Sequence, residues 1–247
     1  MNHTTNLSMG RMRRSVLGAA ILSSLFVPSL ASAFSFTDGN MFNLFYAKTE
    51  YQAGAGGTTS TSGNSLGNPG NARTVVHTVA GSSGTSRVGA SHIATQSLTT
   101  TPPTGFLSVD MGIDAQLLTS STIQIGRLAF VVEQNGTLFA SDTITWTGNG
   151  WTGIFPDGLF EQDFEQINFQ TSTYRNSGVN PDFDLAGSSL RFGFLTWAES
   201  SSLDAQSVTM LFDNFNVNFT ANPVPEPATL SVLALAALAR RRRLRSA

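Results

Sequence analysis

Acidic side chains are the first residues of this sequence whose spacing could support catalysis. Glu161, Asp163 and Glu165 alternate within one short stretch. Two carboxylates at a defined separation are what the hydrolysis of a glycosidic bond requires. Three acids so close together repel each other, and such a row is usually a solvated face. A secreted glycoside hydrolase using these acids is therefore kept as an alternative.

The other catalytic residue types give weaker signals. His77 and His92 alternate with small or apolar residues, which favours hydrogen-bonded sheet residues over a base or a metal pair. Ser65 matches the nucleophile-elbow pattern, but its Gly- and Ser-rich surroundings predict neither the strand nor the helix that this turn needs. The absence of cysteine excludes cysteine catalysis and cysteine-ligated metals. We predict that the protein is not an enzyme.

Aromatic side chains are better candidates, for binding. Trp146 and Trp151 bracket a turn, and we expect Tyr174 and Trp197 to come near it. Flat rings of this kind stack on the apolar faces of sugars. The alternative is that the same rings pack in the core or at its rim.

Short strands must position these residues, because the hydrophobic pattern has a period of two. Gly, Ser, Asn and Pro separate the apolar runs, and the exception is a short helical turn passing into a strand within residues 160–169. The predicted fold is all-β, a single antiparallel, jelly-roll-like β-sandwich over residues 34–222. The predicted strands are Phe34 to Thr37, Met41 to Ala47, Thr74 to Ala80, Ser91 to Leu98, Phe106 to Ile113, Thr122 to Val132, Thr137 to Trp146, Leu190 to Trp197 and Ser207 to Phe219.

Two connections are predicted in detail. Residues 53–72 contain six glycines and no charge, which is typical of a flexible surface loop. For one hairpin we favour a four-residue loop, Glu133 to Gly136, over a tight turn at Asn135 and Gly136, because the longer loop matches apolar with apolar and opposite charges. The longer loop opposes Ile125 to Ile144, Ile123 to Trp146 and Arg127 to Asp142.

The N-terminus has the pattern of a secretory signal peptide in residues 1–33. Arginines precede the apolar run from Val16 to Leu30, and Ala31 and Ala33 are the small residues that signal peptidase accepts before Phe34. The run is shorter than the roughly 20 residues that span a bilayer, so cleavage is favoured over an uncleaved anchor. We expect the general secretion route, with a twin-arginine route as the alternative.

The C-terminus, residues 223–247, has a second targeting pattern. Val224, Pro225, Glu226 and Pro227 lead into twelve uncharged residues, and then into Arg240, Arg241, Arg242 and Arg243. A helix of twelve residues reaches about 18 Å, less than the hydrocarbon core, so we expect only a transient stop in the inner membrane. By the positive-inside rule the arginines lie in the cytoplasm and the preceding residues outside it.

Net charge excludes one class of partner. The two ends contain eight of the 14 basic residues, so residues 34–224 have six basic and 15 acidic residues and a formal charge of −9. Such a surface repels phosphate backbones, and we expect no nucleic-acid partner.

The order proline-glutamate-proline, short hydrophobic helix and C-terminal run of arginines resembles the PEP-CTERM sorting signal of exported bacterial proteins. The resemblance implies a Gram-negative host, an exosortase that removes the tail near Pro225 to Pro227, and delivery to the cell surface or an exopolysaccharide matrix. An ordinary C-terminal anchor is the alternative, on the same side of the membrane.

A looser resemblance covers about forty residues before the tail. The stretches starting at Asn180, Leu190 and Phe212 are similar to the closing strands of jelly-roll domains of PEP-CTERM proteins and, distantly, to carbohydrate-binding modules. The inward phase changes between Phe212 and Phe215, which predicts a bulge at Asp213 and Asn214.

The same resemblance bears on metal binding. In the similar modules an acid near the position of Asp213 can ligate a structural calcium. Asp182 and Asp184 alternate like oxygen ligands but lack the glycine and distal glutamate of a calcium loop, so we favour turn residues over ligands.

These observations favour an exported, non-enzymatic sandwich that associates with extracellular polysaccharide as a binding or matrix component. The alternatives are the hydrolase described above and a purely structural adhesin. The expected partners are signal peptidase, exosortase and polysaccharide, with no cofactor other than calcium.

Overall fold

The computed structural model describes residues 34–222, except 42–44, 102–104, 119–120, 157, 169–174 and 176. Residues Ser32–Asn222 form one compact unit. The signal peptide, the sorting tail and their expected helices lie outside the described residues. Within the described part of the chain, no helix is long and apolar enough to cross a bilayer.

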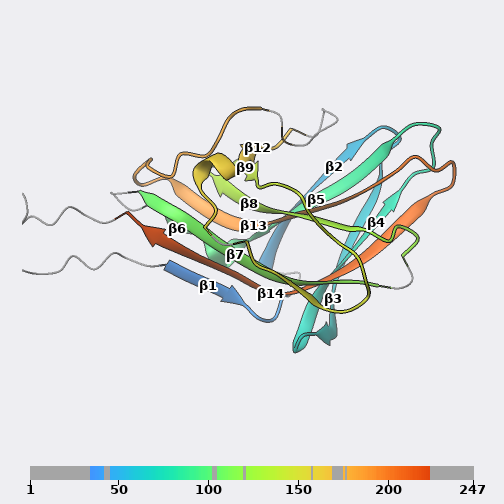
Figure 1. Cartoon of the computed structure of the whole chain (residues 1–247), viewed down its shortest axis with the longest axis horizontal. Coiled ribbons are helices and arrows are strands. Elements are labelled where there is room, and N and C mark those ends of the chain that lie inside the picture. Colours follow the sequence, from blue (N-terminus) through green and yellow to red (C-terminus); the bar gives the residue numbers. More distant parts are fainter. Residues whose placement is uncertain are drawn as a thin grey trace, which may run out of the picture. The chain divides into compact units, whose positions relative to one another are not determined.

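Two antiparallel sheets form a β-sandwich (Figure 1). The six-stranded sheet contains β1 (Phe34–Asp38), β3 (Gly57–Gly67), β4 (Gly70–Val79), β7 (Phe106–Leu117), β11 (Thr152–Ile154) and β14 (Gln206–Ala221). The eight-stranded sheet contains β2 (Tyr46–Ala53), β5 (Ser86–Ala94), β6 (Thr99–Thr100), β8 (Gly126–Gln134), β9 (Thr137–Ala140), β10 (Ile144–Trp146), β12 (Glu165–Gln166) and β13 (Ser189–Ser200). Their orders are β11-β7-β14-β4-β3, with β1 also on β14, and β12-β9-β8-β13-β5-β2, with β10 on β8 and β6 on β13.

Aromatic side chains fill the space between the sheets. Phe194 of β13 lies with its ring centroid 4.9 Å from that of Phe212 and 6.0 Å from that of Phe215, both on β14. The predicted bulge is confirmed, because the register of β14 on β7 shifts between Asp213 and Asn216. Asn214 takes a positive φ of 52° there. The extra residue keeps both halves of β14 facing the core.

The predicted hairpin register is wrong. Gln134 pairs directly with Thr137, so the connection is the tight turn. Asn135 (φ 51°) and Gly136 (φ 86°) both have the left-handed backbone that a two-residue turn of this kind requires. Beyond β9 the register shifts by one residue, and β10 pairs Ile144 with Leu128 and Trp146 with Gly126. Asp142 lies instead against Arg175, and Arg127 against Glu199.

The predicted loop at residues 53–72 is also wrong, because it contains β3. Gly57 to Asn64 pair with Val79 to Ala72 of β4, and the chain turns back at residues 68–69. β3 has mostly short polar side chains, so its pairing is carried by the backbone ladder. The helical turn expected within residues 160–169 is confirmed as a 3₁₀ turn at Glu161–Asp163, followed by β12.

Candidate functional site

Two acids of the predicted carboxylate row accept hydrogen bonds from backbone N–H groups of the chain. The Asp163 carboxylate accepts a hydrogen bond from the Phe160 N–H at 2.8 Å, and Glu161 accepts one from the Phe183 N–H at 3.3 Å. Glu165 lies on β12, opposite Ala140. Two of the three acids therefore hold the 3₁₀ turn and its neighbouring segment.

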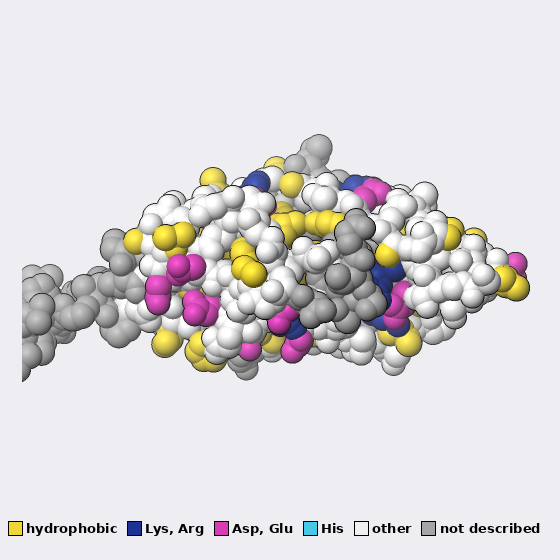
Figure 2. Space-filling model, turned by 90° about the horizontal axis from the view of Figure 1, so that it is seen from above, with side chains coloured by type: hydrophobic (Ala, Val, Ile, Leu, Met, Phe, Trp, Pro, Cys, Tyr) yellow, Lys and Arg dark blue, Asp and Glu magenta, His cyan; other side chains and the backbone are white. Residues whose placement is uncertain are grey.

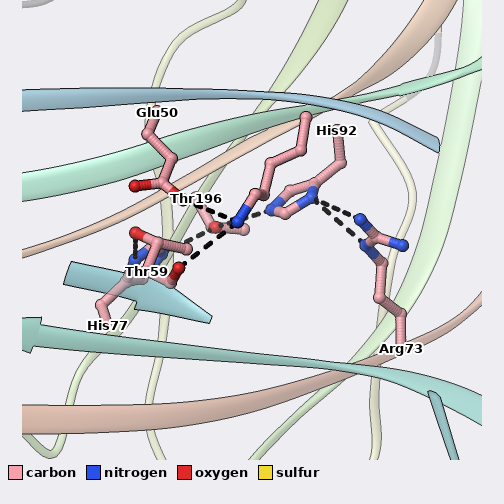
Figure 3. A network of polar contacts seen from close by, with 7 residues as sticks. Glu50, Thr59, Arg73, His77, His92 and Thr196 are labelled. Atoms are coloured by element: carbon pink, nitrogen blue, oxygen red, sulfur yellow. Dashed lines mark hydrogen bonds and ion pairs between the residues drawn. The ribbon is translucent and has the colours of Figure 1, made fainter. Parts of the chain in front are cut away.

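The two histidines lie in a polar network between the sheets (Figure 3). Both are completely buried, as expected for hydrogen-bonded sheet residues. The Arg73 guanidinium donates to Nδ1 of His92 from Nε and Nη2, at 3.2 Å each. Because arginine has only donors, His92 must hold its proton on Nε2, which faces the Thr196 hydroxyl at 3.4 Å.

The network continues to the edge of the sandwich. His77 Nε2 lies 2.9 Å from the Thr196 hydroxyl, and His77 Nδ1 lies 2.8 Å from the Thr59 hydroxyl. Burial lowers the pKa of His77 to about 3. Burial, followed by the charge of Arg73, also lowers the pKa of His92. Both rings are neutral parts of the core and have no access to a substrate.

Sequence reasoning missed Arg73, although a signal for it existed. Arg73 alternates with Val75, His77 and Val79 along β4, so it faces inward with them. It is 1% exposed, and its guanidinium carbon lies 4.9 Å from the centre of the Tyr46 ring. The Tyr46 hydroxyl donates to Asp38 at 3.1 Å. This ring contact places the arginine charge inside the sandwich.

The structure does not assemble the predicted tryptophan platform. Trp146 is 7% exposed and packs its ring edge-on against Phe212 in the core. A Cβ at Gly126 would lie 2.3 Å from the Trp146 ring, so the glycine provides the space for it. Trp151 is half-buried just before β11, in the other sheet. Tyr174 lies outside the described residues.

The three predicted calcium ligands do not form one site. Asp184 lies beside Asn222 at the end of β14, whereas Asp213 lies at the bulge, eight residues or about 26 Å along the strand. Both oxygens of Asp213 accept backbone N–H groups, from Asn68 and Asn214. Among the described residues no group of three His, Asp or Glu could hold a metal. Binding of a structural calcium stays a prediction.

Trp197, the remaining predicted ring, lies on the outer face of the eight-stranded sheet. This face has its own apolar cluster, formed by Ile93, Ala129, Val131, Ala140, Leu195 and Trp197, with Tyr51, Leu138 and Ile167 at its margin. Trp197 is 3% exposed and Leu195 is fully buried. In Figure 2, viewed from above the orientation of Figure 1, hydrophobic side chains line a hollow with charged groups beside it.

Tyr51 and Trp197 occupy one row across this face. Both pair with Gly89, from opposite sides. A Cβ at Gly89 would lie 2.9 Å from the Trp197 Cβ, so the lack of a side chain at Gly89 lets Trp197 lie close against β5. The half-buried Tyr51 places its hydroxyl 3.4 Å from that of Ser91. Sequence reasoning ended this strand at Ala47 and missed Tyr51, although the alternation through Thr49 reaches it.

Ion pairs surround the apolar floor. Glu199 of β13 accepts a hydrogen bond from Nη2 of Arg87 at 2.7 Å and forms an ion pair with Nη2 of Arg127 at 3.2 Å. Arg191 pairs with Glu133 on the neighbouring strand, and Arg175 pairs with Asp142. We call the group Arg87, Arg127 and Glu199 the arginine cluster.

No protein-family model matches the chain. No curated protein matches it either. Among solved structures, the family 11 carbohydrate-binding module of a cellulosomal cellulase of Clostridium thermocellum is 17% identical, with a TM-score of 0.43, and the match covers 78% of this chain and 97% of that one.

Two further matches are modules of family 22. The C-terminal module of Clostridium thermocellum Xyn10B is 12% identical at a TM-score of 0.36, covering 77% of this chain and 96% of that one. The xylan-binding domain of Paenibacillus barcinonensis Xyn10C is 16% identical at a TM-score of 0.33, covering 78% and 97%. None of these likenesses assigns a ligand to this chain.

Proposed function

We propose that this protein is exported and binds an extracellular polysaccharide on the outer face of its eight-stranded sheet. The observation that carries the proposal is the second apolar cluster, because an antiparallel sandwich normally exposes polar side chains on its outer faces. An apolar floor with a few convergent polar groups is the common form of a binding surface. The half-buried Tyr51 ring at its margin supplies the sugar-facing aromatic surface, and the buried Trp197 ring supports the floor beside it.

Export and sorting are the second part of the proposal. They rest on the signal-peptide pattern before Phe34 and on the proline-glutamate-proline tail. The tail delivers the sandwich to the cell surface or matrix, where polysaccharide is the abundant ligand. Replacing Pro225, Glu226 and Pro227 with alanine should leave a longer, membrane-retained species. An unchanged mature C-terminus by mass spectrometry would refute this part.

A panel of soluble polysaccharides tests the binding function. The purified protein is run by native electrophoresis through gels that contain neutral or acidic polymers, beside a non-binding protein of similar size. We expect retardation by at least one polymer and none for the reference protein. If no polymer retards the chain, polysaccharide binding is refuted and the structural adhesin remains.

A further inference from the structure

The basic residues of the sandwich are concentrated on one side. Of the six basic residues between positions 34 and 222, Arg87, Arg127 and Arg191 lie on the outer face of the eight-stranded sheet, and Arg175 lies at its margin. The other two, Lys48 and Arg73, belong to the network between the sheets. Among the described residues, no basic side chain lies on the outer face of the six-stranded sheet, which presents Asp110 and Asp114 of β7.

The arginines of this face differ in how their charge is balanced. Arg191 and Arg175 each pair with a carboxylate of their own, Glu133 and Asp142. Arg87 and Arg127 share the single carboxylate of Glu199. The arginine cluster therefore has two positive charges and one negative charge.

One nitrogen of the cluster lacks a partner. Nη1 of Arg127 is buried and makes no hydrogen bond with any described residue, while Nη2 of Arg127 holds Glu199. A buried donor without an acceptor is costly, so this guanidinium gains from any acceptor that reaches it. The Arg127 side chain as a whole is 17% exposed, so a ligand can approach the guanidinium from solvent, and a shift of the side chain is needed to bring the buried Nη1 to it.

We propose that the arginine cluster binds the carboxylate of an acidic sugar, so that the polysaccharide recognised by this protein contains uronic acid. This inference rests on the proposed function. A planar carboxylate matches the fork of a guanidinium and would supply an acceptor for Nη1 of Arg127.

The cluster and the aromatic row have the spacing for one ligand. Trp197 on β13 lies opposite Gly89 on β5, and Glu199, two residues further along β13, lies opposite Arg87. The two rows are therefore about 7 Å apart on the same face. Arg127 precedes Leu128, the partner of Thr196, and so lies beside Trp197. A saccharide chain that contacts Tyr51 at one end of this row and crosses the strands along it brings a substituent to Arg127 at the other end.

The formal charge of −9 on residues 34–224 does not prevent this binding. Salt screens exposed charges beyond about 8 Å at physiological ionic strength. Glu199 lies within the cluster, and Glu133 and Asp142, the other acids of this face that form ion pairs among the described residues, are each held by an arginine of their own. The charges of the arginine cluster itself, rather than the net charge of the domain, therefore determine whether a carboxylate binds there.

Polygalacturonate and its fully methyl-esterified form test the inference on the purified protein, because they share a backbone and differ in the carboxylate. We expect binding of the acid form to be at least about tenfold tighter, as for a charged hydrogen bond, and to weaken with added salt. Equal binding of the two forms would overturn the inference and leave polysaccharide binding intact. Tighter binding of dextran sulfate than of polygalacturonate would overturn the assignment to a carboxylate.

Three variants separate a ligand contact from a structural role. Arg127→Gln should weaken binding of polygalacturonate about tenfold and leave the melting temperature nearly unchanged, because Glu199 keeps Arg87. Arg191→Gln is the matched control on the same face and should have little effect. Glu199→Gln removes the competing carboxylate and should tighten binding. If Glu199→Gln and Arg127→Gln both weaken binding, or if neither polymer form binds, the inference is wrong; neutral polymers then decide the proposed function separately.

Discussion

The two outer faces of the sandwich are built from the same kind of antiparallel strand but carry opposite chemistry. On the six-stranded sheet, β3, β4 and β14 present short polar residues such as Ser60, Thr78 and Thr209. On the eight-stranded sheet, the corresponding central strands present Ile93, Val131 and Leu195. The first face is an ordinary solvated surface, and the second has an apolar floor.

One exposed aromatic makes the comparison sharper. Phe155 lies on the six-stranded sheet, 56% exposed, over two glycines. A Cβ at Gly112 or at Gly153 would lie 2.3 Å from its ring. Exposure of an aromatic ring alone therefore does not define the candidate site. What distinguishes the other face is the combination of rings, apolar floor and arginines.

The comparison requires Trp146 to belong to the core and to neither face. Trp146→Ala should lower the free energy of unfolding by about 3–5 kcal/mol, because it leaves a cavity against Phe212. Trp151→Ala, at a half-buried ring before β11, should cost less than about 1 kcal/mol. Urea unfolding measures both variants. Equal losses of unfolding free energy in the two variants would mean that Trp146 and Trp151 have the same structural role.

The apolar floor should stabilise the fold, and the polar face should not. Leu195→Ala, on the eight-stranded sheet, is expected to cost about 2–5 kcal/mol, because the side chain is fully buried. Thr209→Ala is the matched change on the six-stranded sheet and should stay within about 0.5 kcal/mol. Similar melting temperatures for the two variants would mean that the faces do not differ in packing.

The network between the faces predicts a loss of stability in acid. An unfolded chain protonates histidine near pH 6.5, whereas burial holds the pKa of His77 at about 3 and lowers that of His92. Their contribution is therefore complete above pH 6.5 and is lost as the pH falls towards 3. The loss is about 2 kcal/mol for His77 between pH 7 and pH 5, and His92 acts in the same direction.

His77→Gln tests this assignment. The variant should lose the part of the pH dependence that His77 supplies, about 2 kcal/mol between pH 7 and pH 5, while Asp213, whose pKa burial raises, contributes equally to both proteins. Denaturant unfolding at several pH values measures the difference. If the unfolding free energy of the variant depends on pH as strongly as that of the parent protein, the acid sensitivity does not come from His77.

The strand pattern and the bulge could be predicted because alternation of apolar residues is local. The change of phase between Phe212 and Phe215 was visible in the sequence, and both residues are buried. The hairpin was mispredicted because Ile123 and Ile125, which favoured the longer loop, precede β8 and do not pair within it. The left-handed preference of Asn135 and Gly136 outweighed that matching.

The candidate site was harder to predict, because residue type does not reveal which side of a sheet a ring occupies. Trp146 and Trp197 are both inside apolar strands, yet one faces the core and the other the outer surface. β3 was missed because Gly, Ser and Thr leave no apolar alternation to detect. Which of two faces binds a ligand depends on pairing partners far apart in the sequence.

The smallest expected effect is the most direct test of the claim that polysaccharide binds to the outer face of the eight-stranded sheet. The affinity of the protein for its best polysaccharide from the panel is measured by calorimetry for Tyr51→Ala and Phe155→Ala, two aromatic truncations on opposite faces. We expect Tyr51→Ala to weaken binding by about 0.5–1.5 kcal/mol, roughly 2- to 12-fold, and Phe155→Ala to leave it unchanged. Weaker binding by Phe155→Ala with no effect of Tyr51→Ala would place the ligand on the six-stranded sheet and contradict the account.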